Sequence, residues 1–540
     1  MMPPKDLYHG ADAREKILDG VRKLSKMVVV TMGPKGRNVI IERGDRTPIV
    51  TKDGVTVAQE IYLKDPVENM GAQIVKAAAR KTNDVAGDGT TTATLLSYAI
   101  MEEGLEHMLK SEKNAISLKR GIEYAVHALT AHLAKMATPI NHEDQYKAIA
   151  TISAQDERVG DAIASVLKKA GRDGVVTVEA GTGFGLEEVF TEGMQFDNGY
   201  LSPYFVTNPE KMECVMDTVP ILLTDERIVS VDQILPILNQ LGKNGQRKLI
   251  IIAESVEGDA LATLVVNKIK NNFIAVPVKA PAFGRRRTDM LGDIAALTGG
   301  IVISRETGKT LEKVVPEDLG MARKVIISKH QTTILEGAGK RIDIDTRIGE
   351  IKNQIAAAEK PNDKEKLQER LAKLAGGVAI IRVGAATEFE QRELQHRVED
   401  ALSATKAAVE EGILPGGGVA YIRAVQACEK QVMLDLKEED ERLGAQIVFS
   451  ALPSCLLAVV QNAGFDAEVV LEDVEKGTGS YGFNANTGKY GDMLEMQVID
   501  PCKVARVALE NAASVAGMFL TLEGSISDTP VPAGPDDGEA

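Results

Sequence analysis

The feature that most constrains the fold of this chain is a change of hydrophobic period along its length. Apolar residues recur at helical spacing across residues 10–135 and again across 400–520. The runs between these two regions are short and β-rich: 249–252, 275–278, 301–303 and 325–327. Amphipathic segments of roughly 10–15 residues separate several of these runs, as in an α/β module. The sequence therefore predicts an α/β part inserted between two helix-rich parts.

A second helical pattern follows the β-rich region. Isoleucines step by four, three and four from Ile344 to Ile355, and leucines resume the stripe from Leu367 to Leu374. Pro361-Asn362-Asp363 interrupts the pattern between them. We expect an αα-hairpin that ends at Gly376-Gly377. A stand-alone coiled coil is the alternative, but it needs a longer repeat.

Size and composition indicate a soluble protein of several domains. The chain has 540 residues, 44% of them hydrophobic and 26% charged. No apolar run is expected to reach the roughly 18 residues that a membrane span needs. Residues 1–6 show neither a signal-peptide core nor Arg/Ser-rich transit character. We expect a cytoplasmic, bacterial protein without a membrane partner.

Charge and metal-ligating residues exclude several classes of function. The net charge of −15 argues against nucleic acid as a partner, and ordinary solubility explains it. The seven histidines form no ligand cluster. The four cysteines are too scattered for a zinc site and are expected to be structural thiols: Cys214, Cys428, Cys455 and Cys502.

Residues Gly87-Asp88-Gly89-Thr90-Thr91-Thr92 open an apolar helix and carry the groups that phosphate chemistry needs. Glycines let the backbone approach an anion, and the first helical turn offers unpaired N–H groups and a partial positive charge. The threonine hydroxyls add donors, and Asp88 supplies a hard oxygen suited to Mg²⁺. The alternative is an ordinary Gly-rich turn capped by Asp and Thr.

Two more glycine-containing turns lie within the first 92 residues. Thr31–Asn38 ends a helical segment, because Gly33 and Gly36 bracket Pro34. Thr51-Lys52-Asp53-Gly54 brings a further carboxylate. The three turns together could grip one polyphosphate. None is a Walker A loop, since the nearest match, at residues 308–310, has Ile303 where that motif needs its first glycine.

These motifs resemble those of the group I chaperonins, the bacterial GroEL and mitochondrial Hsp60 family. The resemblance runs from about Lys5 to about Pro530. The segments that carry it are Thr31–Asn38, Thr51–Val55, Glu68–Gln73, Gly87–Thr92, Glu192–Asp197, Tyr200–Phe205, Lys366–Val378, Val398–Ala401, Gly416–Gly418 and Ala512–Gly517.

The resemblance implies a GroEL-like multidomain fold of helical and α/β parts. A helical equatorial domain that binds ATP and forms the ring takes residues 1–135 and 411–540. A small α/β intermediate domain takes 136–192 and 378–410, and an α/β apical domain is inserted at 193–377. The family's hinges match Gly193, Gly376 and Gly377 above and Pro139 and Gly412 below; a plain turn looks the same in sequence. Residues 528–540 lack the relatives' Gly-Gly-Met repeats and are expected to be disordered.

The resemblance also implies a site for ATP, Mg²⁺ and K⁺. Asp88 matches the Mg²⁺ ligand, and the backbone oxygens of Thr31 and Lys52 match the K⁺ site. Asp400, assisted by Asp53, matches the carboxylate that orients or deprotonates the attacking water; taken alone, Asp400 would be a solvated helix residue. The nucleotide-binding positions are Thr31, Met32, Gly33, Pro34, Lys52, Asp88, Gly89, Thr90, Thr91, Thr92, Gly416, Gly417, Asn484, Ala485 and Asp500.

A surface for unfolded or misfolded proteins and for a GroES-type co-chaperonin is implied in the apical domain. In an average protein such apolar stripes form the core. The family instead exposes them toward a chamber lined by acidic residues, where they bind non-native chains. The matching residues are Tyr200, Tyr204, Phe205, Leu235, Leu238, Leu261, Val265 and Val266.

Departures from the family pattern concern assembly, which the resemblance implies to be homo-oligomeric, in seven-membered rings stacked in pairs. Asn198 replaces an arginine that pairs across subunits with the residue matching Glu388, although exposed pairs are worth only about 0–1 kcal/mol. Leu457 replaces an inter-ring arginine, while Asp466 keeps its region acidic. Asp84 and Lys329, another family pair, are both retained.

Three functions remain open from the sequence. An ATP-driven folding chamber is favoured, because Asp53, Asp88 and Asp400 are all intact. A ring-forming paralogue with a scaffold or specialised binding role is the alternative. A small-molecule kinase is disfavoured, since no second acceptor pocket is evident.

Overall fold

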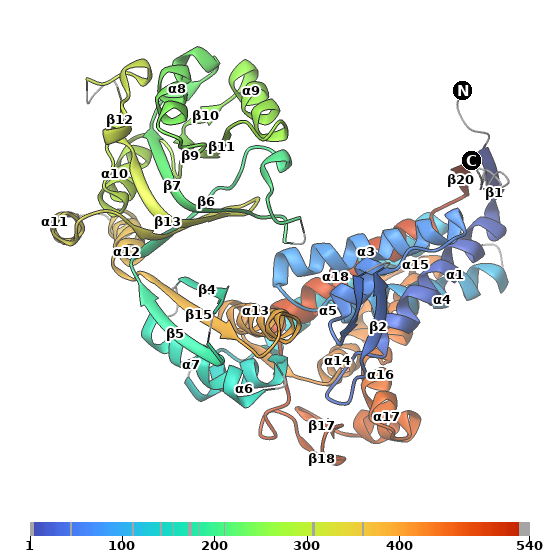
Figure 1. The fold of residues 1–540 in the computed structure, drawn as a ribbon. Helices are drawn as coiled ribbons and strands as arrows, with labels where there is room; N and C mark the ends of the chain where they lie inside the picture. The colour runs from blue at the N-terminus through green and yellow to red at the C-terminus, as the bar shows by residue number, and fades with distance from the viewer. Residues whose placement is uncertain are drawn as a thin grey trace. The chain divides into compact units, whose positions relative to one another are not determined.

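The computed structural model describes residues 5–43, 46–110, 113–140, 143–154, 156–170, 175–181, 183–209, 211–304, 308–358 and 361–528. The chain forms two compact bodies (Figure 1). The first combines Met1–Ala164 with Ala386–Ala540, and the second is Ser165–Ala385. The predicted nested layout is therefore confirmed, because the two helix-rich ends of the chain share one body. The expected tail lies almost wholly outside the described residues.

The first body is built mainly of helices. Its long helices bury one continuous apolar core, in which α18 packs against α3, α4 and α5, so that the two ends of the chain interleave (Figure 1). The helices are α1 (Gly10–Val29), α2 (Gly54–Glu60), α3 (Pro66–Ala86), α4 (Thr90–Lys110), α5 (Ala115–Met136), α6 (Glu143–Ala154), α13 (Glu388–Glu411), α14 (Val419–Asp435), α15 (Glu439–Ala451), α16 (Ser454–Asn462), α17 (Ala467–Lys476) and α18 (Cys502–Leu520). Helix α7 (Glu157–Ala170) crosses the boundary between the bodies.

In the described part of this body, four two-stranded antiparallel sheets accompany the helices. Two of them join segments that are far apart in the sequence, β1 to β20 and β16 to β19. The other two are local hairpins, β2–β3 and β17–β18. The strands are β1 (Lys5–His9), β2 (Val39–Arg43), β3 (Arg46–Thr51), β16 (Ile413–Pro415), β17 (Tyr481–Asn484), β18 (Lys489–Asp492), β19 (Ile499–Pro501) and β20 (Gly524–Asp528).

One stretch corrects the expectation about membrane-length runs. Residues Glu439–Asn462 are long and apolar enough to cross a membrane by composition. The structure divides them into α15 and α16, with Pro453 at the junction, and 61% of the apolar window is buried inside the body. A core helix of a soluble protein passes the same test, so the stretch is weak support for a membrane span.

The second body is an α/β fold around a seven-stranded sheet (Figure 1). The strand order is β11-β9-β7-β13-β14-β6, with β12 beside β7. The strands are β6 (Gly193–Asp197), β7 (Cys214–Thr224), β9 (Lys248–Ala253), β11 (Ile274–Lys279), β12 (Val302–Ile303), β13 (Gly320–Ile327) and β14 (Gln331–Gly337). All four predicted β-rich runs lie in this sheet. Its helices are α8 (Leu235–Lys243), α9 (Gly258–Ile269) and α10 (Arg285–Thr298).

Smaller elements complete the second body. Strand β15 (Val378–Gly384) pairs in parallel with β4 (Val175–Ala180) and antiparallel with β5 (Gly185–Thr191). A short ladder joins β8 (Arg227–Ile228) and β10 (Ser255–Val256).

The predicted αα-hairpin is confirmed as α11 (Arg341–Ala357) and α12 (Pro361–Ala375). Arg347 and Arg370, one from each helix, bind the fully buried Asp293 of α10. A buried carboxylate needs such partners, so this cluster fixes the hairpin on α10.

Candidate functional site

The Gly87–Thr92 turn is the centre of the candidate site. Helix α3 ends at Ala86 and is capped by Gly87, which has a left-handed φ of 70°, and α4 begins at Thr90. A Cβ on Gly87 would lie 2.3 Å from Cβ of Ser403 on α13. A Cβ on Gly89 would lie 2.7 Å from Cγ1 of Val504 on α18. Both glycines are therefore required, because the turn is packed between two helices from the other end of the chain.

Two of the predicted carboxylates, Asp53 and Asp500, each interact electrostatically with Asp88 of this turn. Burial raises the pKa of Asp88, and the charge of Asp53 adds to the increase. Burial likewise raises the pKa of Asp500 to about 7, with a further contribution from the charge of Asp88. Interactions of this kind require the groups to lie near one another. Asp88 and Asp500, whose pKa values are raised, are suited to receive cationic charge, and such perturbed groups mark candidate functional sites.

Asp53 has a structural role at the start of α2. Its carboxylate accepts hydrogen bonds from the backbone N–H groups of Val55 at 3.0 Å and Thr56 at 2.9 Å, so it is the N-cap of this helix. The Thr51–Gly54 turn contacts the Gly87–Thr92 turn, since a Cβ on Gly54 would lie 2.1 Å from Oγ1 of Thr91. The cap thus holds Asp53 in a fixed place beside α4.

Asp500 lies in β19, opposite the glycine loop that follows β16. Its carboxylate accepts a hydrogen bond from the Gly417 N–H, which lowers its pKa against the effect of burial. The Gly416 N–H donates to the Val498 carbonyl at 2.9 Å. The predicted positions Gly416, Gly417 and Asp500 are therefore brought together by the β16–β19 pair.

The loop after α1 joins the same region through an apolar cluster, which we call the hairpin cluster. Gly33 has a φ of 82°, and a Cβ there would lie 3.1 Å from Cγ1 of Val459. The cluster's buried members are Val419, Ile422, Leu456, Val459, Val460, Ala467, Val470, Val474, Phe483, Ala485 and Met493, and Met32 packs against them. Asn462 of α16 donates to the carbonyls of Val29 at 2.8 Å and Met32 at 3.0 Å. Sequence reasoning missed this asparagine.

Asn484 ends strand β17 at this cluster, and Ala485 follows it. The Asn484 side-chain oxygen accepts from the backbone N–H groups of Asn486 and Thr487, which shapes the hairpin turn. Ala485 is buried in the hairpin cluster. The structure thus gives Asn484 a turn-forming role beside its predicted contact with adenine.

Asp400 lies on α13, on the side that packs toward the Gly87 turn. Ser403, which approaches Gly87, is one turn after Asp400, and Ala407, which packs with Ala86 and Val504, is a turn further on. Residues three and four apart share a helix face. Asp400 is therefore carried on the face of α13 that meets the turn.

The residues present fit the predicted Mg²⁺. Within the described ranges no group of three or more His, Cys, Asp or Glu side chains is placed to hold a metal ion, so Asp88 would have to hold the ion together with phosphate oxygens. Mg²⁺ in nucleotide sites is typically held by one or two carboxylates together with phosphate oxygens. For K⁺, the Thr31 carbonyl lies in a tight turn where a Cβ on Gly36 would come within 2.0 Å of it.

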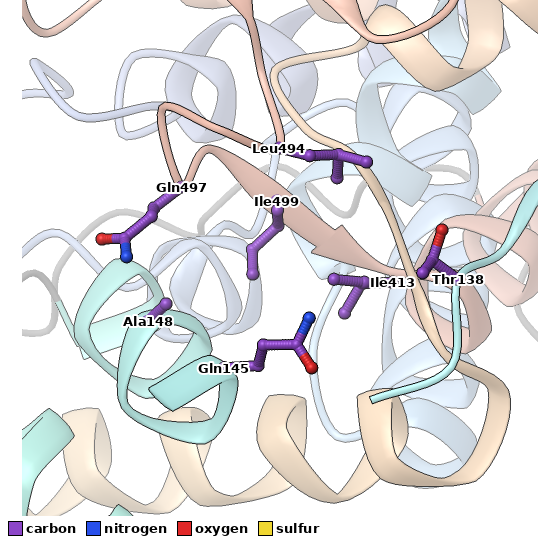
Figure 2. Close-up of a pocket in the computed structure, with 7 residues that line it drawn as sticks. All are labelled: Thr138, Gln145, Ala148, Ile413, Leu494, Gln497 and Ile499. Carbon is purple, nitrogen blue, oxygen red and sulfur yellow. The ribbon is translucent and has the colours of Figure 1, made fainter. Parts of the chain in front are cut away.

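A small cavity of about 160 Å³ lies on the other face of β19 (Figure 2). Its lining is Thr138, Gln145, Ala148, Ile413, Leu494, Gln497 and Ile499. Successive strand residues point to opposite faces, so Ile499 faces this cavity while Asp500 faces Gly417. The cavity is therefore separate from the candidate nucleotide site.

Three of the predicted hinge glycines, Gly193, Gly377 and Gly412, lie where two chain segments meet closely. Thr138 and Ile413 form a bridge with two 2.9 Å backbone hydrogen bonds, and a Cβ on Gly412 would lie 2.8 Å from the Thr138 carbonyl oxygen. In the second body, a Cβ on Gly377 would lie 2.7 Å from the Thr191 carbonyl oxygen. Close approach is thus one reason for these glycines; their movement, and that of Pro139 and Gly376, remains a prediction.

The predicted client surface is only partly exposed in the second body. Tyr204 is 65% exposed, Val266 47% and Leu235 42%. Leu238, Leu261 and Val265 are half-buried against the core. The expected exposure of Tyr200 and Phe205 is wrong: Phe205 is fully buried and Tyr200 is buried, with its hydroxyl bonded to the Met212 carbonyl.

Two departures from the family pattern have local explanations. Asn198 has a φ of 144°, and its amide donates to the Ala280 carbonyl at 3.0 Å. Asparagine tolerates positive φ better than most residues, which favours it at this turn. Leu457 packs against the hairpin cluster, so an apolar side chain suits its surroundings.

Comparisons with known proteins agree with this architecture. A model of the TCP-1/cpn60 chaperonin family matches residues 24–530. The chain is also similar to the crystal structure of the chaperonin gp146 from bacteriophage EL 2 (Pseudomonas aeruginosa), determined in the presence of ATP-BeFx. The two are 23% identical, the match covers 96% of this chain and 98% of the other, and the TM-score is 0.68. The predicted multidomain fold is therefore confirmed.

Proposed function

The chain belongs to the TCP-1/cpn60 chaperonin family, and from that premise we propose that it is an ATP-hydrolysing folding chaperonin of the group I type. The observation that carries this proposal is the convergence of Asp53, Asp88 and Asp500 on glycine turns from both ends of the chain. A scaffold protein has no need of such a cluster. The cations that accompany a bound polyphosphate would supply the positive charge that these carboxylates lack.

In this proposal the chain binds ATP through the start of α4. The N–H groups and threonine hydroxyls of Gly89–Thr92 bind phosphate oxygens, as helix N-termini do. Asp88 holds Mg²⁺, and the carbonyls of Thr31 and Lys52 hold K⁺. The Gly416–Gly417 loop and Asp500 bind the ribose, and Asn484 and Ala485 contact adenine. Bound Mg²⁺ neutralises charge on the phosphates during phosphoryl transfer.

Hydrolysis depends on Asp400 in this account. Its carboxylate orients or deprotonates the attacking water, with Asp53 assisting from its capped position. Phosphoryl transfer needs mainly positioning and charge neutralisation, so these two groups and the cations suffice. Because α13 carries Asp400, any movement of α13 against the Gly87 turn gates the reaction.

Client binding belongs to the second body. The exposed residues Tyr204, Leu235 and Val266 offer apolar surface to unfolded or misfolded proteins. A GroES-type co-chaperonin is proposed to bind the same surface. The chain is then divided as the resemblance implies, with an equatorial domain at 1–135 and 411–540, an intermediate domain at 136–192 and 378–410, and an apical domain at 193–377.

Assembly into homo-oligomeric rings of seven, stacked in pairs in the cytoplasm, is also proposed. Its support is the presence of two separate strand pairs, β1–β20 and β2–β3, each with no third strand among the described residues. Ile40 on β2 is 69% exposed and Ile526 on β20 is 64% exposed. Open sheet edges invite pairing with another chain, and a head-to-tail contact between two different surfaces generates a ring.

The test is ATP-dependent refolding of a denatured protein, with and without a GroES-type co-chaperonin, beside native mass measurement. We expect refolding above the level seen with ADP, by a particle many times the mass of one chain. A ring that hydrolyses ATP but rescues no client would instead support the alternative, a paralogue with a specialised binding role.

A further inference from the structure

We infer that Arg423 positions the base end of the proposed nucleotide site, by fixing strand β17 and with it Asn484 and Ala485. This inference rests on the proposed function. It concerns a residue that does not touch the nucleotide and acts only through the hairpin that does.

Arg423 is a buried cation surrounded by carbonyl groups. It lies on α14 and is 7% exposed. Its Nε donates to the Gly479 carbonyl at 3.0 Å, and its Nη2 donates to the carbonyls of Val474 and Tyr481, both at 2.8 Å. Its Nη1 donates to the Gln426 side chain at 3.0 Å. Within the described part of the chain no carboxylate forms an ion pair with it.

These bonds are needed because the charge is buried. Burial lowers the pKa of the Arg423 guanidinium, with the charge of Glu475 acting against this. A buried charge without hydrogen bonds is costly, so the carbonyls must stay in place around it. The planar guanidinium presents its donors in a fixed fork, which a lysine cannot reproduce.

The carbonyls belong to the segment that leads into the hairpin. Val474 lies in the last turn of α17, where its carbonyl also accepts a hydrogen bond from the Gly477 N–H at 3.0 Å, and Tyr481 is the first residue of β17. Gly477 lies between them, and a Cβ there would come within 2.3 Å of Cδ1 of Tyr481 and 3.2 Å of Nη2 of Arg423. The segment is therefore closely packed on the guanidinium and can occupy only one position there.

The strand carries this constraint to the nucleotide site. Asn484 is three residues beyond Tyr481, and Phe483 and Ala485 are buried in the hairpin cluster. Met493 belongs to the same cluster, and its methyl group would be 3.3 Å from a Cβ on Gly417. Gly417 in turn donates to Asp500. A displaced β17 would thus move the proposed adenine contacts relative to the ribose contacts, while the Gly87–Thr92 turn stays in place.

The experiment distinguishes the contribution of the adenine base to binding from that of the phosphates. Calorimetry measures binding of ATP and of inorganic triphosphate, each with Mg²⁺, to the full-length assembled protein and to Arg423→Met and Arg423→Lys. We expect ATP affinity to fall about tenfold in Arg423→Met, because methionine has no hydrogen-bond donor. The loss should be smaller in Arg423→Lys, because lysine keeps the charge and some donors but not the planar fork. Affinity for triphosphate should stay within about twofold, since the phosphate turn does not depend on β17.

Arg442→Met is the matched control. Arg442 also donates to a backbone carbonyl, that of Leu436 at 2.7 Å, but it lies on α15 away from the hairpin cluster. It should leave both affinities unchanged. Equal losses for ATP and triphosphate in Arg423→Met, or unchanged ATP affinity in a folded variant, would overturn the inference. If Arg423→Met does not fold, Arg423→Lys decides by the same ratio. Failure of the unmodified protein to bind ATP would overturn the proposed function, and the positioning role with it.

Discussion

Replacing Gly87 by alanine tests whether α13 packs on the Gly87–Thr92 turn. The new Cβ would meet Cβ of Ser403 at 2.3 Å, far inside contact distance. The left-handed φ of 70° costs about 1–2 kcal/mol for a residue with a Cβ. Overpacking against Ser403 adds about 1–3 kcal/mol. Gly87→Ala should therefore destabilise the first body by roughly 2–5 kcal/mol.

A double-mutant cycle with Ser403→Gly isolates the contact. Ser403→Gly alone should cost up to about 1 kcal/mol, because glycine is poor in a helix interior. In the double variant the clash is removed but the φ cost remains, so we expect a coupling of about 1–3 kcal/mol in the stabilising direction. Urea unfolding of the nucleotide-free protein, compared between variants, measures each term.

Gly464→Ala is the control for backbone strain alone. Gly464 lies in the same body with a φ of 84°, and no atom lies within 4 Å of its added Cβ. It should cost only about 1–2 kcal/mol. If Gly87→Ala costs no more than Gly464→Ala, or if the cycle shows coupling below about 0.5 kcal/mol, the packing of α13 on the turn is wrong.

Three further predictions follow from the same contacts. Asp400→Ala should bind ATP with nearly unchanged affinity yet hydrolyse it far more slowly, and an unaltered steady-state rate would rule out its role. The pKa of Asp500 is raised from 3.8 to about 7, so the folded state keeps this proton to a higher pH than the unfolded state does. Without nucleotide and Mg²⁺, the free energy of unfolding should therefore fall as pH rises from about 4 to 7, by at most about 4 kcal/mol. Asp500→Asn should remove that dependence on pH in unfolding measurements. Tyr204→Ser should weaken capture of a denatured client without a change in stability, whereas Phe205→Ala should cost about 3–5 kcal/mol of stability; the opposite pattern would contradict the assignment of Tyr204 to the surface and Phe205 to the core.

Local patterns in the sequence predict much of the fold. The isoleucine and leucine steps between Ile344 and Leu374 give both helices of the α11–α12 hairpin, because a helical period is visible within a few turns. The β-rich runs at 249–252 and 275–278 give neighbouring parallel strands β9 and β11. Glycine and proline mark the turns at Gly33 and Gly87 for a similar local reason.

What the sequence does not predict depends on contacts between distant segments. Phe205 looks like other exposed aromatic residues in sequence, but tertiary packing buries it completely. Asp53 as a helix cap and Ser403 as the neighbour of Gly87 are visible only in three dimensions. Arg423 could have been suspected as a lone cation in the apolar segment 419–425, although its four partners could not have been named.

We propose that turns from both ends of the chain hold ATP and Mg²⁺ at Asp88. Calorimetric titration of ATP, with and without Mg²⁺, tests it most directly in the unmodified protein, in Asp88→Asn and in Asp259→Asn, an exposed carboxylate of α9 that serves as control. We expect Mg²⁺ to strengthen ATP binding in the unmodified protein and the control, and Asp88→Asn to reduce this enhancement by about tenfold or more. No ATP binding by the unmodified protein, or an undiminished Mg²⁺ effect in Asp88→Asn, would contradict it.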